Sequence, residues 1–151
     1  MQFHKLISTC LGIGYIGKGA GTAAAIATCI AWYFAWAGGF PPLYPSLFIT
    51  IALTLFGVWS SGIVEKIWGK DPSKVVIDEA AGMCISLLFL PVNWKYVLAA
   101  LILFRFFDII KPLFIKKMEK FPGGWGIMLD DVLAGVYANL LLQLALVFKL
   151  F

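Results

Sequence analysis

The chain has 151 residues, of which 62% are hydrophobic and 13% are charged, and its formal net charge is +4. This charged fraction is about half of the roughly 25% expected of a soluble domain, whose small core could not bury so many apolar side chains. The composition therefore excludes a soluble globular domain, a disordered chain and a secreted disulfide scaffold, and predicts a single integral-membrane domain over residues 1–151. The modest positive charge suits anionic lipid head groups and does not favour nucleic acid.

Five apolar segments approach the roughly 20 residues that a membrane-spanning helix needs. In chain order they cover residues 20–37, 46–64, 75–91, 96–111 and 127–148. The third segment stops early at Pro91, so it is a short span or a re-entrant helix, and the fourth ends at Lys111 because the residue before a proline disfavours helix. Residues 3–16 are too few to span and are expected at the membrane interface. We predict an all-α polytopic membrane helix bundle of about five hydrophobic segments.

Lysines between these segments predict the orientation of the chain, because positive residues stay on the cytoplasmic side. Residues 38–45 contain no lysine, and residues 91–95 contain only Lys95. The loops on the other side carry the clusters Lys66, Lys70 and Lys74, and Lys111, Lys116, Lys117 and Lys120. The pattern predicts a cytoplasmic amino terminus, five spans and a carboxyl terminus on the opposite side.

The eight carboxylates fall into two groups. Three stand among the lysines of the cytoplasmic loops and are expected to be solvated: Glu65, Asp71 and Glu119. The other five lie within or at the ends of apolar segments: Asp78, Glu79, Asp108, Asp130 and Asp131. A charge in hydrocarbon costs several kcal/mol unless it is paired or hydrated, so these five are functional candidates. The predicted orientation places all five at one depth, on the cytoplasmic side.

Helix capping is the alternative explanation for these acids, because carboxylates in a first turn complement the helix dipole. For either adjacent pair taken alone, Asp78–Glu79 or Asp130–Asp131, capping is as good an explanation as a functional role. It does not account for Asp108 near a helix carboxyl end, where a negative charge is unfavourable. Crowded carboxylates with few nearby cations favour a divalent metal, and oxygen ligands suit Mg²⁺.

The only arginine, Arg105, stands three residues before Asp108, and Lys111 follows three residues later. This spacing places the three side chains on one flank of a helix. Arg105 and Asp108 either form an intrahelical ion pair or leave the guanidinium free to grip a phosphate, with Lys111 as a second positive charge. The two possibilities are compatible.

Glycines give two further signals. Gly82 and Gly135 each follow an acid by four residues, and small residues there allow two helices to approach closely, which would also bring the acids together. Residues 12–19 contain a GxGxxG pattern and nearly match a Walker loop, but no strand precedes them, so we reject both motifs. A turn whose backbone amides face a phosphate, together with Gly21 and Thr22, is the idea that remains.

Three linked motifs contain these acids: Ile77-Asp-Glu-Ala-Ala-Gly-Met83, Phe104-Arg-Phe-Phe-Asp-Ile-Ile-Lys-Pro112 and Gly123-Gly-Trp-Gly-Ile-Met-Leu-Asp-Asp-Val-Leu-Ala-Gly135. They resemble the phosphatidylglycerophosphatase A family, with order and spacing matching over about residues 12–140. The resemblance implies a Mg²⁺-dependent lipid phosphatase of the bacterial inner membrane that converts phosphatidylglycerophosphate to phosphatidylglycerol and inorganic phosphate. The family's amino-terminal Pro-Gly-Thr-x-Gly-Ser motif is represented here only by Gly21 and Thr22.

From the residues and the resemblance together we expect a site facing the cytoplasm, with the phospholipid substrate in the cytoplasmic leaflet. The expected Mg²⁺ ligands are Asp78, Glu79, Asp130 and Asp131. Arg105, Lys111, Gly21 and Thr22 are expected to bind the phosphate, and the expected catalytic residues are Asp108, Asp131 and Glu79. Asp108 is either a ligand or the general base. A metal-activated water and an aspartyl-phosphate intermediate both fit this set.

Two other functions fit the composition. A small proton- or cation-coupled transporter would also place acids in the membrane, but it predicts related halves and acids near the midplane. A non-catalytic lipid-binding or assembly subunit predicts little effect when the acids are replaced. The acids at the segment ends favour the phosphatase.

Overall fold

The computed structural model describes residues 1–151 and contains helices but no strand, which confirms the all-α prediction. Each predicted apolar segment overlaps one of the five longest helices. In chain order the elements are α1 (Gln2–Ser8), the 3₁₀ helix η1 (Ile13–Ile16), α2 (Ala20–Trp36), α3 (Leu43–Trp68), α4 (Ile77–Leu87), α5 (Trp94–Ile110), α6 (Ile115–Met118) and α7 (Gly124–Val147).

Helices α3 and α7 are long and apolar enough to cross a bilayer, whereas the apolar helix α2 has 17 residues. Helix α4 has only 11 residues, well below the roughly 20 that a span needs, which agrees with the short third segment expected from the sequence. Length and composition therefore identify two candidate spans, and the crossing of the membrane by all five segments stays a prediction.

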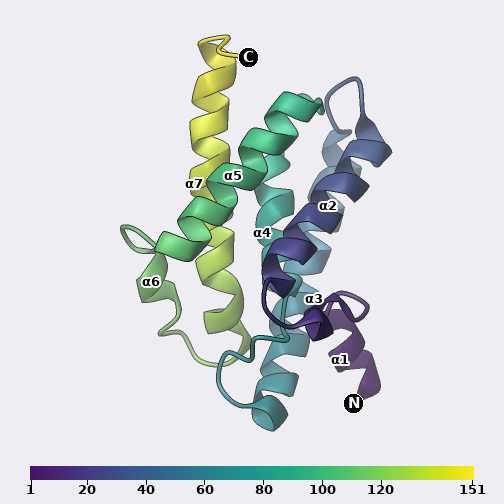
Figure 1. Ribbon diagram of the computed structural model, residues 1–151, viewed down its shortest axis with the longest axis vertical. Coiled ribbons are helices and arrows are strands. Elements are labelled where there is room, and N and C mark those ends of the chain that lie inside the picture. Colours follow the sequence, from purple (N-terminus) through teal and green to yellow (C-terminus); the bar gives the residue numbers. More distant parts are fainter.

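Helix α4 lies at the centre of the bundle and packs against α2, α3, α5 and α7 (Figure 1). Most of its side chains are buried, including Met83, Cys84 and Leu87. The two chain termini lie at opposite ends of the long axis, with the amino terminus at the end where the 69–76 and 119–123 loops gather (Figure 1). This central position brings the acidic first turn of α4 beside three other helices.

Gly82 and Gly135 let α4 and α7 approach closely, as their spacing predicted. A Cβ atom on Gly82 would lie 2.6 Å from the Asp131 carbonyl oxygen, and one on Gly135 would lie 2.4 Å from the Gly82 carbonyl oxygen. Side chains at either position would force the two backbones apart. The contact fixes Asp131 beside the amino-terminal turn of α4.

The carboxyl end of α4 is held by amide side chains from α7. Asn139 Nδ2 donates to the Ser86 and Leu88 carbonyl oxygens at 3.0 and 2.8 Å. Gln143 Nε2 donates to the Leu88 and Phe89 carbonyl oxygens at 3.3 and 3.4 Å. These bonds satisfy carbonyl groups that a helix end leaves without partners.

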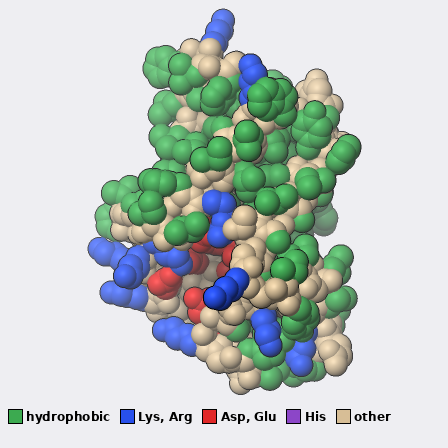
Figure 2. Space-filling view, viewed as in Figure 1, with side chains coloured by type: hydrophobic (Ala, Val, Ile, Leu, Met, Phe, Trp, Pro, Cys, Tyr) green, Lys and Arg blue, Asp and Glu red, His purple; other side chains and the backbone are tan.

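Large hydrophobic side chains cover much of the outer surface, as expected of a protein in contact with lipid. Phe34 and Phe48 are 80% and 74% exposed. Figure 2 shows hydrophobic side chains over most of the upper part of one face, whereas lysine, arginine and acidic side chains gather in its lower half. The polar end coincides with the acidic turn of α4.

Candidate functional site

All five carboxylates of the apolar segments line one pocket of about 370 Å³. Asp78 and Glu79 come from the first turn of α4, Asp108 from the last turns of α5, and Asp130 and Asp131 from α7. The recess with acidic side chains, ringed by basic ones, is visible in Figure 2. The structure thus brings together the acids that the predicted orientation placed at one depth.

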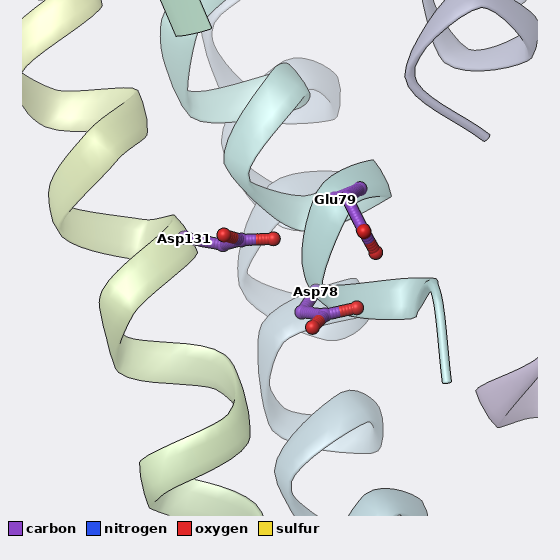
Figure 3. A group of neighbouring side chains, drawn as sticks. All are labelled: Asp78, Glu79 and Asp131. Atoms are coloured by element: carbon purple, nitrogen blue, oxygen red, sulfur yellow. The ribbon is translucent and has the colours of Figure 1, made fainter. Parts of the chain in front are cut away.

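Three of these acids form a group suited to a metal ion. One carboxylate oxygen each of Asp78, Glu79 and Asp131 lies within 4.8 Å of the others, and Asp131 points from α7 toward the two on α4 (Figure 3). Oxygen atoms of all three are buried without a hydrogen-bond partner, and Asp131 is only 2% exposed. Burying an unpaired charge is costly, so the donor set fits a cation that takes oxygen ligands.

Asp130 lies in the same pocket but outside this group of three. Its Oδ2 accepts from Lys111 Nζ at 2.6 Å, while its Oδ1 is buried without a partner. Lys111 also pairs with Glu119, which the sequence placed among the solvated loop charges. The Glu119 side chain is nevertheless 38% exposed, as expected of a solvated charge, and Lys111, in the left-handed backbone region with φ of +50°, ends α5 within reach of both acids.

Arg105 forms the intrahelical ion pair that the sequence left open. Its Nη1 donates to Asp108 Oδ2 and lies 3.8 Å from Glu79 Oε1. Its Nε is buried without a partner. The guanidinium is therefore oriented by two carboxylates of the pocket and keeps a donor free for a ligand.

Gly21 reaches the pocket, but Thr22 is not among its lining residues. A Cβ atom on Gly21 would lie 2.0 Å from Glu79 Oε1, so the absence of a side chain lets α2 approach this carboxylate. Thr22 is half-buried in the first turn of α2. Of the two predicted amino-terminal phosphate ligands, the structure brings only Gly21 to the site.

A family model described as Phosphatidylglycerophosphatase A matches residues 6–146. The chain belongs to this family. A Haemophilus influenzae relative named phosphatidylglycerophosphatase A is 50% identical over 70 residues, which cover 45% of this chain and 43% of the relative. The Escherichia coli K12 protein of the same name is 44% identical over 68 residues, covering 44% and 40%.

A Bacteroides thetaiotaomicron relative, provisionally named phosphatidylinositol-3-phosphatase, is 50% identical over 100 residues, covering 64% of this chain and 63% of the relative. The alignments therefore span between 40% and 63% of these curated relatives. No solved structure matches the chain significantly.

Two further charged residues of this pocket, Lys18 and Asp71, were not predicted to belong to the site, whereas Gly17 and Gly19 belong to the glycine turn whose amides the sequence suggested could face a phosphate. Asp71 belongs to the predicted cytoplasmic loop, but it contributes to the lining of the pocket. Lys18 could have been noticed as a lysine between two glycines directly before the first apolar segment. Glu65, expected in a loop, lies within α3 because that helix continues to Trp68.

The three cysteines, Cys10, Cys29 and Cys84, are free. The Cys10 thiol lies 3.6 Å from the Val76 carbonyl oxygen, to which it donates. Burial raises the pKa of Cys10 to about 12, and the negative charge of Glu79 adds to this shift. The thiol is therefore neutral near pH 7 and is not a nucleophile for the pocket.

Proposed function

We propose that the protein is a Mg²⁺-dependent membrane phosphatase that hydrolyses phosphatidylglycerophosphate to phosphatidylglycerol and inorganic phosphate. The observation that carries this proposal is the group of Asp78, Glu79 and Asp131 beside Arg105: the three carboxylates lie close enough to hold one metal ion, and each has a buried oxygen without a hydrogen-bond partner. Membership of the phosphatidylglycerophosphatase A family and the names of two relatives support the same reaction. These findings favour a phosphatase over the transporter and the non-catalytic subunit.

Asp78, Glu79 and Asp131 would hold the Mg²⁺ ion, and Asp130 could add its free Oδ1. The three acids come from two helices whose contact depends on Gly82 and therefore form a rigid set of ligands. Bound there, Mg²⁺ would supply Lewis acidity toward the phosphoryl oxygens and offset the mutual repulsion of the carboxylates.

The residues around the ion would position the substrate and move the proton. Arg105, held by Asp108 and Glu79, would donate to phosphate oxygens, because a guanidinium matches their geometry. Asp108 would accept a proton from the attacking water as the bond between phosphorus and the glycerol oxygen breaks, and would return that proton to the leaving oxygen to give the alcohol. Phosphoryl transfer depends mainly on positioning and charge neutralisation, which such a set of groups provides.

An aspartyl-phosphate intermediate, formed by attack of Asp131, is the competing route. The two routes are separated by quenching the reaction in acid during turnover. Phosphate that remains attached to the denatured protein would favour the covalent route, whereas its absence would favour direct attack by water.

We further propose that the chain is a single domain of the bacterial inner membrane with about five hydrophobic segments, of which the third is short or re-entrant, and with the pocket on the cytoplasmic side. The exposed hydrophobic surface, the two long apolar helices and the lysines around the pocket support this arrangement. Cysteines introduced over residues 66–74 should react with an impermeant reagent only from the cytoplasm. Labelling from the opposite side would contradict the orientation.

The decisive experiment is phosphate release by the purified protein from phosphatidylglycerophosphate in detergent micelles, with Mg²⁺ or with a chelator. We expect release with Mg²⁺ and none with the chelator. Micelles containing phosphatidylinositol 3-phosphate test the activity suggested by the name of the Bacteroides relative. Absence of metal-dependent release from phosphatidylglycerophosphate would refute the proposed reaction.

A further inference from the structure

The cations of the pocket are not equally free to meet a ligand. Three of them line it, namely Lys18, Arg105 and Lys111. Arg105 is paired with Asp108, and Lys111 is paired with two carboxylates. Lys18 forms no ion pair and no side-chain hydrogen bond, and its side chain is exposed at the mouth of the pocket. It is the pocket cation whose charge is not already engaged by an acid.

The backbone around Lys18 adds further donors. Gly17 and Gly19 have φ of +94° and +86°, in the left-handed region that glycine adopts without strain. The amides of Gly17, Lys18 and Gly19 donate no hydrogen bond within the protein, although all three residues line the pocket. This turn leads directly into α2, a helix of 17 residues whose amino-terminal dipole attracts negative charge.

Acids that line the same pocket also indicate a ligand. Asp131 is 2% exposed and its Oδ2 has no partner, and Asp130 Oδ1 is likewise buried and unpartnered. These acids require a cation. An anion that contacts both that cation and the glycine turn would give partners to the free amides as well. A phosphate monoester has several oxygens and can contact both sides of the pocket at once.

We propose that Lys18 and the free amides of Gly17 and Gly19 bind the phosphate monoester of the substrate together with Arg105. This inference rests on the proposed function and assigns the anion to the α2 side of the pocket. It gives Lys111, which the sequence suggested as a phosphate ligand, the role of holding Asp130 and Glu119 in place. The glycine turn that resembled a nucleotide-binding motif thereby receives a role without a strand or a nucleotide.

Steady-state kinetics of Lys18→Gln on phosphatidylglycerophosphate test the assignment. We expect KM and the inhibition constant for inorganic phosphate to rise about tenfold, the loss expected when one charged hydrogen bond is removed, with a smaller change in kcat. Lys18→Arg should recover most of the affinity because the charge is retained. Equal constants for Lys18→Gln and the wild type would overturn the proposal.

Lys74→Gln is the matched control. Lys74 is a nearby lysine that lies over the Tyr15 and Trp68 rings at 5.8 and 5.5 Å and does not line the pocket. The Lys74→Gln substitution removes the same charge from the same end of the molecule but outside the pocket. KM and the inhibition constant for phosphate should therefore be unchanged. An equal effect of both variants would indicate general membrane electrostatics and overturn a specific role for Lys18.

A binding measurement separates this inference from the proposed reaction. Inorganic phosphate, added with Mg²⁺, should raise the thermal unfolding temperature of the wild type and of Lys74→Gln equally, and that of Lys18→Gln by a smaller amount at the same phosphate concentration. If the protein releases no phosphate from lipid but keeps this Lys18-dependent shift, the reaction fails and the anion site stands. A shift that is equal in all three proteins, or absent from all three, overturns the anion site.

Discussion

Polar groups at the carboxyl end of α4 have hydrogen-bond partners, whereas several at its amino end have none. At the carboxyl end, the Ser86 and Leu88 carbonyl oxygens accept hydrogen bonds from Asn139 of α7, and Gln143 adds two longer bonds. At the amino end, carboxylate oxygens of Asp78 and Glu79 are buried without partners and face Asp131. The same two helices, α4 and α7, supply both arrangements.

This difference separates groups that support the fold from groups that await a ligand. Buried polar atoms in proteins are normally hydrogen-bonded, because leaving one unpaired costs about 1–3 kcal/mol and more when it is charged. The carboxyl end follows that rule through Asn139, so its bonds stabilise the bundle. The amino end violates it at several neighbouring atoms, which is expected where a bound cation and substrate complete the contacts.

The largest expected effect comes from Asp131→Asn, beside the amino end of α4, where carboxylate oxygens lack hydrogen-bond partners. Phosphate release should fall by roughly 10²–10³-fold, the typical cost of removing one group that stabilises charge in a transition state. The unfolding temperature should hold or rise, because the change removes a buried charge that Asp78 and Glu79 repel. Phosphate release and thermal unfolding in the same detergent measure the two effects.

Glu65→Gln is the matched control for that variant, because it also turns a carboxylate into an amide but lies on α3, outside the acid pocket. It should retain the wild-type rate. A normal rate for Asp131→Asn would remove Asp131 from the site, and an unfolded variant would show that the acid is structural.

The contrast between the ends of α4 was only partly predictable from the sequence. Hydropathy and lysine distribution are sufficient to place Asp78, Glu79 and Asp131 at one depth, because both depend on which residues occur in each segment. Gly82 likewise indicates a close helix contact through its spacing alone. The amino end of α4 could therefore be recognised as a candidate site before its geometry was known.

Pairings within the site depend on the tertiary structure. Lys111 contacts Asp130 and Glu119 because the chain leaves α5 through two residues with positive φ, Lys111 and Leu113, which no sequence motif announced. Only the structure shows that Lys18 has no ion-pair partner, because this depends on which acids the other cations contact. For the same reason, the sequence did not single out Asn139, an ordinary polar residue in an apolar helix.

At the carboxyl end of α4, Asn139→Leu should lower the stability of the protein. Leucine has a similar size but no donor, so the Ser86 and Leu88 carbonyl oxygens would lose a partner, and the free energy of unfolding should fall by about 1–3 kcal/mol. Thermal unfolding measures this loss, and the folded fraction should keep its rate of phosphate release.

Gln143→Leu provides the comparison, because the bonds of Gln143 are longer, at 3.3 and 3.4 Å, and its loss should cost less. If Asn139→Leu lost activity without losing stability, the division between the two ends would be wrong.

The smallest expected effect comes from Gly21→Ala, which disturbs the amino end of α4 without removing any of its charges. The new Cβ would lie 2.0 Å from Glu79 Oε1, so the carboxylate at the end of that flexible side chain must move. Phosphate release should fall about tenfold, because small displacements of catalytic groups are costly, while stability changes little. Gly39→Ala, where a Cβ meets no atom within 4 Å, should leave the rate unchanged. Equal rates for both alanine variants would mean that the position of Glu79 does not limit the reaction, and the role of the amino end would then rest on Asp78 and Asp131.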